Sequence, residues 1–184
     1  MAAKTERKAI DKVFILLGLA ATLTLLVVGV LTWYGYTFAS DMVKANLTEQ
    51  RIFFPPSGSP ALTSLPATDQ EQMNKYAGQQ LVNGDQAKVY ADNFIKVHLN
   101  EVAEGKTYSE VSAEAMKDPG NQTLQMQKTV LFQGETLRGL LLGSGYSYWT
   151  FGKIAKYVSV VSFVGALCMA LLVLLGMRHL SRVK

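Results

Sequence analysis

Two long apolar segments, one near each end of the chain, constrain the fold most strongly. Residues 13–33 and 157–177 contain no charged side chain. Because an α-helix rises about 1.5 Å per residue, about 20 residues cross the roughly 30 Å hydrocarbon core of a membrane. The sequence therefore predicts two transmembrane helices, with all the residues between them on one side of the lipid bilayer.

The positive charge lies where the apolar segments meet the chain termini. Basic residues precede the first segment and follow the second: Lys4, Arg7, Lys8, Lys12, Arg178, Arg182 and Lys184. Lys and Arg next to membrane spans are retained in the cytoplasm. We therefore expect a multi-pass plasma-membrane protein with both termini cytoplasmic. The formal net charge of +4 comes from these basic flanks of the apolar segments. The positive charge is thus explained by membrane orientation, and we expect no nucleic-acid partner.

A cleaved signal peptide is the alternative interpretation of the first apolar segment. Its apolar run exceeds the roughly 7–15 residues typical of signal peptides. The best small-x-small site, Thr37-Phe38-Ala39, is a weak match to a cleavage site. We favour a retained anchor, and the second segment would hold the chain in the membrane in either case.

The predicted fold is mainly α, with two transmembrane helices that flank a helical extracytoplasmic domain. Its predicted parts are a cytoplasmic tail (1–12), the first transmembrane helix (13–37), the extracytoplasmic domain (38–152), the second transmembrane helix (153–177) and a second cytoplasmic tail (178–184). Four of the five prolines fall within 55–66, which we expect to be a Pro-rich linker without regular structure.

Two patterns predict helices in the extracytoplasmic domain. Apolar residues recur at three- and four-residue spacing over 87–102, which is typical of an amphipathic helix. Thr107 and Glu110 have the spacing of a capping box, in which the two residues satisfy each other's backbone amides. This predicts a short helix from Thr107 to about Lys117.

A further helix is expected after Thr123, leading toward the second apolar segment. Gly139, Gly143 and Gly145 lie just before a group of aromatic residues over 146–151. Aromatic side chains suit the membrane interface, where the ring is buried and its polar edge stays hydrated. We therefore expect an aromatic belt at 146–151, with the glycines forming a bend before the second span.

No residue pattern indicates catalysis, a cofactor or a metal. His98 is predicted outside the cytoplasm and His179 inside it, so the only two histidines cannot share a metal ion. No other spacing of acids and histidines resembles a metal site. We therefore expect neither an enzyme nor a cofactor-binding protein, and the remaining enzymatic alternative is an external site around His98.

Small residues mark a candidate helix-packing ridge in the second apolar segment: Ser162, Gly165, Ala166 and Ala170. In lipid, small residues allow a neighbouring helix to approach closely. The ridge packs either on a helix of another membrane protein or on the chain's own first span, near Gly18.

A second candidate contact is Ile52-Phe53-Phe54, three large apolar residues next to the Pro-rich linker. These side chains either pack on the extracytoplasmic domain or meet an external partner.

One segment carries a family resemblance. With His98-Leu99-x-Glu101 followed by Gly105-Lys106-Thr107-Tyr108-Ser109-Glu110, the chain resembles a group of small two-span membrane proteins of actinobacteria. In that group, a helix ending in a similar turn lies between the spans. The resemblance implies the membrane topology and no catalytic residue.

The sequence favours a non-catalytic accessory or structural subunit of a larger membrane protein complex, such as a respiratory or other energy-transducing complex. Its expected partners are the lipid bilayer and other membrane protein subunits. The alternative is a free-standing, membrane-anchored extracytoplasmic module for binding or envelope maintenance.

Overall fold

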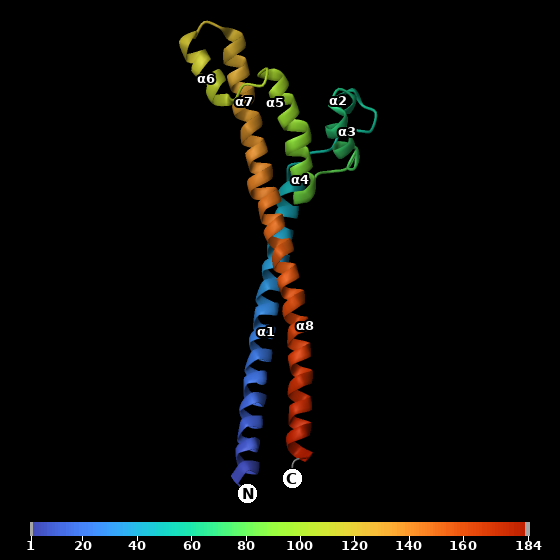
Figure 1. Ribbon diagram of the computed structural model, residues 1–184. Coiled ribbons are helices and arrows are strands. Elements are labelled where there is room, and N and C mark those ends of the chain that lie inside the picture. Colours follow the sequence, from blue (N-terminus) through green and yellow to red (C-terminus); the bar gives the residue numbers. More distant parts are fainter. Residues whose placement is uncertain (1, 183–184) are drawn as a thin grey trace. The chain divides into compact units, whose positions relative to one another are not determined.

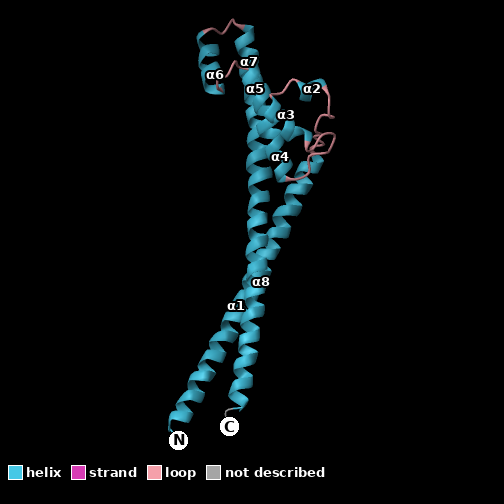
Figure 2. Cartoon of the chain, turned by 45° about the vertical axis from the view of Figure 1, so that its right-hand side comes forward, coloured by secondary structure: helices cyan, strands magenta, loops and turns pink. Residues whose placement is uncertain are grey.

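The computed structural model describes residues 2–182, with side chains from residue 6 onward, and it is mainly helical (Figure 1). Its elements are α1 (Ala2–Glu49), α2 (Pro60–Thr63), α3 (Ala67–Asn74), α4 (Gly84–Tyr90), the π-helix η1 (Ala91–Ile95), α5 (Lys96–Val102), α6 (Tyr108–Lys117), α7 (Gln122–Leu140), the π-helix η2 (Leu141–Ser147) and α8 (Tyr148–Arg182). Among the described residues, the β-structure is limited to an isolated bridge between Phe53 and Gln80. The predicted mainly α class is confirmed (Figure 2).

The chain divides into two compact units. The two-helix unit comprises residues up to 38 and from 151, and the central unit comprises residues 39–150. The ends of the two predicted tails, residues 1 and 183–184, lie outside the described residues.

The two-helix unit contains two helical regions that are long and apolar enough to cross a membrane. Its helices run antiparallel, because Gly18 of α1 lies beside Val173 of α8, whereas Gly29 lies beside Phe163. The buried residues of α8 in this unit recur at three- and four-residue spacing: Gly152, Ala155, Ser159, Ser162, Ala166 and Val173. This spacing is typical of left-handed helix packing at a shallow crossing angle.

Glycine allows the close approach of the two helices. A Cβ atom added at Gly18 would lie 2.6 Å from Val173 Cγ2, and one at Gly29 would lie 2.8 Å from Phe163 Cε1. A buried hydrogen bond crosses the same interface, where Ser159 Oγ donates to the carbonyl oxygen of Gly29 at 2.8 Å. The two helices are therefore joined by small-residue packing and by one buried polar contact.

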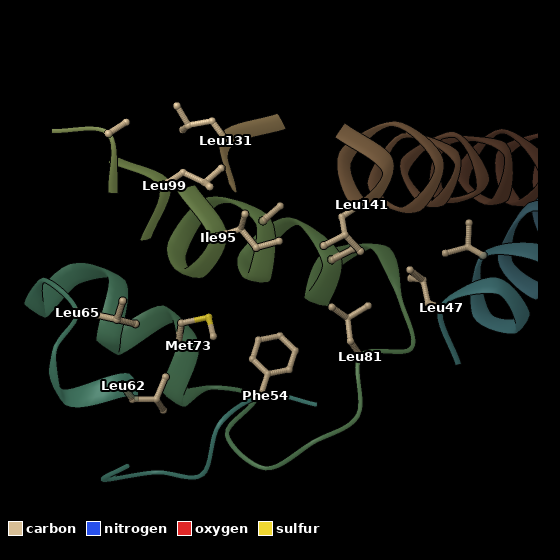
Figure 3. Packing of buried hydrophobic residues seen from close by; sticks show 14 of the residues in the cluster. Leu47, Phe54, Leu62, Leu65, Met73, Leu81, Ile95, Leu99, Leu131 and Leu141 are labelled. Atoms are coloured by element: carbon tan, nitrogen blue, oxygen red, sulfur yellow. The ribbon is translucent and has the colours of Figure 1, made fainter. Parts of the chain in front are cut away.

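The central unit has its own apolar core (Figure 3). Leu62 of α2 and Met73 of α3 are fully buried beside Phe54, and Leu81 precedes α4. Leu99 of α5 and Leu131 of α7 extend this core toward the α6–α7 hairpin. The segment 55–66, which was expected to lack regular structure, therefore contains the short helix α2. The buried side chain of Leu62 holds this helix against the core.

Both predicted signals for helices in the central unit are confirmed, with one addition. The Thr107–Glu110 capping box is complete, since Glu110 N donates to Thr107 Oγ1 at 3.3 Å and Thr107 N donates to Glu110 Oε2 at 2.7 Å. The helical region over 87–102 exists, but its middle is the π-helix η1. The π-helix was not predicted.

The expected bend at Gly139, Gly143 and Gly145 is wrong. α7 passes through η2 into α8 without a loop. Ser147 Oγ donates to the carbonyl oxygen of Leu142 at 2.9 Å, five residues earlier, which satisfies an acceptor in this wider turn. The glycines therefore stand in continuous helical backbone.

Candidate interaction surfaces

The predicted small-residue ridge of α8 contacts the chain's own first helix. Ser162 is 6 % exposed and Ala166 is 2 % exposed. Gly165 is half-buried, and a Cβ atom there would lie 3.4 Å from Leu25 of α1. Ala170 is half-buried as well. With α1 in place, a foreign helix can reach only the half-buried edge formed by Gly165 and Ala170.

The Ile52-Phe53-Phe54 segment is divided between the core and the surface. Phe54 is 1 % exposed, and its ring lies 5.3 Å from the rings of both Tyr76 and Tyr90. Ile52 is half-buried against the same core. Phe53 is 57 % exposed, because it points away from Phe54 across the extended backbone of the Phe53–Gln80 bridge. Only Phe53 is thus available to an external partner.

A more extensive candidate surface lies on α7 and η2. Their exposed side includes uncharged residues at three- and four-residue spacing: Thr129, Phe132, Thr136, Gly139, Leu140 and Gly143. Phe132 and Leu140 are exposed although they are large and apolar. Cβ atoms added at Gly139 or Gly143 would meet no atom within 4 Å. We call these six residues the outward face of α7.

This face was missed because its glycines were interpreted as a bend. The available signal was the spacing, since positions three and four residues apart lie on one side of a helix. Of the charged residues of this helix, Lys128 and Arg138 are half-buried, whereas Glu135 is exposed and lies at the edge of the outward face, three residues after Phe132 and four before Gly139. A solvent-facing helix side whose six central residues are uncharged and include two glycines is suited to packing against another helix.

A charged cluster in the central unit pairs Asp92 with two basic side chains of the same chain. Asp92 Oδ2 accepts from Lys88 Nζ at 2.6 Å, and Asp92 Oδ1 accepts from Arg138 Nη2 at 3.2 Å. Partial burial raises the pKa of Asp92, but the hydrogen bonds from Lys88 and Arg138 outweigh it and hold the pKa below its ordinary value. The cluster ties α4 and η1 to α7.

A polar hollow of about 440 Å³ opens beside this cluster. Its walls include Asp69, Asp92, Lys96 and Glu101. Asn93 Nδ2 donates to Asp69 Oδ1 at 2.7 Å and Asp92 is paired with Lys88 and Arg138, so two of these carboxylates are already engaged. The hollow offers both signs of charge to a small polar ligand, and it is the strongest candidate binding site of the central unit.

His98 is packed against its own helix. His98 is half-buried, and its Nδ1 lies 2.8 Å from the carbonyl oxygen of Phe94, one helical turn earlier. Its ring lies 4.4 Å from the ring of Phe94. These contacts give His98 a packing role. Among the described side chains, no group of three or more His, Cys, Asp or Glu residues is placed to hold a metal ion.

Comparison with protein-family models, curated proteins and solved structures finds no match for this chain.

Proposed function

We propose that this chain is a non-catalytic subunit of a larger membrane protein complex, anchored by α1 and α8 with both termini in the cytoplasm. The proposal depends chiefly on the outward face of α7. Phe132 and Leu140 are exposed there beside Gly139 and Gly143, which have open space around them. Large apolar side chains exposed beside a flat, small-residue surface are typical of an interaction site.

The two-helix unit supports an anchoring role. Ser159 and Gly29 join its helices through a buried hydrogen bond, and the sides of the helices away from this interface are apolar and exposed. Residues 157–177 contain no ionisable side chain apart from Tyr157 and Cys168. Ion and proton pathways ordinarily need polar or charged residues within the membrane, which makes transport by this helix pair alone a poor alternative.

The outward face of α7 belongs to the part of the chain that we place outside the cytoplasm. A partner there would be the extracytoplasmic part of another membrane subunit, and it would present a helix to Gly139 and Gly143. An energy-transducing assembly, such as a respiratory complex, is the partner class that we would test first.

The second candidate function is a membrane-anchored binding module. The polar hollow lined by Asp69, Lys96 and Glu101 favours it, because its mixed charges suit a small polar ligand. In this alternative, no other subunit is required, and the outward face of α7 would remain exposed.

Extraction with a mild detergent, followed by native gels and mass spectrometry, separates the two functions. The subunit proposal expects the chain in a complex with other membrane proteins. Gly139→Leu should release it from that complex, since the added side chain occupies the space of a partner helix. Ala113→Leu, which introduces the same side chain at an exposed position of α6, should not. Migration only as a monomer of 20.2 kDa or as a homo-oligomer would refute the proposal.

The topology has a separate test. In a Cys168→Ala background, cysteines placed at Ala3 and Val183 should resist an impermeant thiol reagent in sealed cells, whereas one at the exposed Ser64 should react. Labelling of either terminal position would contradict cytoplasmic termini.

A further inference from the structure

Asp11 is an acidic residue on the side of α1 that faces α8. It precedes Ile15, Gly18 and Thr22 at the same three- and four-residue spacing, and all four residues are at least half-buried. The other described acid of this unit, Glu6, is exposed. Asp11 therefore points toward the helix interface, whereas the surrounding tail is basic.

One oxygen of the Asp11 carboxylate accepts no hydrogen bond. Asp11 Oδ2 is shielded from solvent and has no hydrogen-bond partner. A buried carboxylate oxygen without a donor is unfavourable, so its burial is better explained if a ligand supplies one. A carboxylate accepts most strongly from a cationic N–H donor, so an ammonium group is the partner that best satisfies this oxygen.

A cleft of about 220 Å³ opens at the same point between α1 and α8. Asp11 and His179 line it, together with the apolar side chains of Phe14, Met169 and Leu172. At about 1.5 Å per residue, the seven-residue separation between Asp11 and Gly18 extends the cleft about 10 Å along the helices. It therefore combines a polar end with an apolar interior.

The chemistry of this cleft matches one class of amphiphile. Asp11 lines the cleft and suits an ammonium group. The exposed Arg7, Lys12 and Arg178 do not line it but lie within four residues of Asp11 or His179 in the sequence, and basic side chains suit a phosphate group. The apolar interior suits part of an acyl chain, since the cleft is smaller than the 300–1,000 Å³ typical of sites that enclose a whole ligand. We propose that this cleft binds the headgroup and upper acyl chain of an aminophospholipid, with its primary ammonium on Asp11.

This inference rests on the membrane placement of α1 and α8 in the proposed function, but not on the presence of partner subunits. It also predicts a hierarchy among lipids. Phosphatidylethanolamine has three N–H donors for Asp11, phosphatidylcholine has a cation without N–H donors, and phosphatidylglycerol has no cation. The expected order of binding is therefore phosphatidylethanolamine first, with the other two well below it.

The test is native mass spectrometry of the purified full chain in detergent with an equimolar mixture of these three lipids. Phosphatidylethanolamine should be retained preferentially. Asp11→Asn, which preserves the shape and removes the charge, should reduce that preference about tenfold, as expected for a lost charge-assisted hydrogen bond. Glu6→Gln makes the same change at an exposed position of the same tail and should leave the preference unchanged.

Three outcomes would overturn the proposal. Equal retention of all three lipids would show that the headgroup is not recognised. Equal retention of phosphatidylethanolamine and phosphatidylcholine would show that Asp11 receives no N–H donor. Loss of the chain from a membrane complex in Asp11→Asn, without any lipid preference in the wild type, would assign Asp11 to a partner's cationic side chain. Since lipid binding is measured on the isolated chain, its failure is distinguishable from failure of the subunit proposal.

Discussion

Gly84→Ala tests the packing of α4 against η2 and Trp149, the second residue of α8, in the central unit. A Cβ atom at Gly84 would lie 2.2 Å from Trp149 Cβ, 2.6 Å from Trp149 Cγ and 2.9 Å from the carbonyl oxygen of Gly145. None of these atoms is the end of a flexible side chain, so the helices must separate. Separation also strains the hydrogen bond from Trp149 Nε1 to Asp85 Oδ2, which is 2.9 Å long.

The expected loss of stability follows from these two effects. Overpacking typically costs about 1–3 kcal/mol, and a hydrogen bond to a charged group contributes about 1.5–3 kcal/mol when it is fully lost. With partial loss of the bond, Gly84→Ala should lower the free energy of unfolding by about 2–4 kcal/mol. Thermal unfolding of the full chain in detergent measures this, and a Trp33→Phe background isolates the fluorescence of Trp149.

Gly139→Ala is the matched control, because its Cβ would meet no atom within 4 Å. Alanine is favoured over glycine by up to about 1 kcal/mol in a helix interior, so this variant should be slightly more stable than the wild type. If Gly84→Ala unfolds at the wild-type temperature with unchanged Trp149 fluorescence, the packing of α4 on η2 and Trp149 is wrong.

Three further predictions concern single polar contacts. Ser159→Ala removes the hydrogen bond to Gly29 and should destabilise the two-helix unit by about 0.6–1.7 kcal/mol in a detergent unfolding titration; no change would show that the bond contributes nothing. Thr107→Ala removes the N-cap of α6 and should cost about 1 kcal/mol, measured by thermal unfolding, with an unchanged melting temperature as the contrary result. Asp92 has a folded-state pKa below its ordinary value of 3.8. Its stabilisation should therefore be complete at neutral pH and be lost as pH falls below about 4, through the folded-state pKa. Asp92→Asn should flatten this acid-induced decrease in melting temperature, and a pH profile identical to that of the wild type would contradict the linkage.

Local signals in the sequence predict local structure well in this chain. The capping box predicts α6 with both reciprocal hydrogen bonds, because Thr107 and Glu110 interact within one turn. The apolar segment 13–33 predicts the long helix α1 for the same reason, since length and composition alone decide it. The division of Ile52-Phe53-Phe54 was not predictable, because it depends on Gln80 pairing with Phe53 across a long sequence separation.

The π-helix η1 had a sequence signal that was not used. Ala87, Ala91, Ile95 and Leu99 are all buried, and they are spaced by four residues throughout. In an α-helix with 3.6 residues per turn, this spacing drifts by about 40° at each step. A π-helical turn is wider, because its hydrogen bonds join residues five apart. Inserting η1 therefore keeps all four side chains on the core side.

The glycines of α7 and η2 fall into two groups. Some lie against other side chains of this chain, and others face open space. A Cβ at Gly134 would lie 2.4 Å from Leu99 Cδ2, and one at Gly145 would lie 3.1 Å from Ala87 Cβ, so packing explains both. Gly139 and Gly143 have no such neighbour. A glycine within a helix costs up to about 1 kcal/mol relative to alanine, and nothing inside this chain offsets that cost at these two positions. A close contact with another helix would offset it, which is why the outward face of α7 supports the subunit proposal.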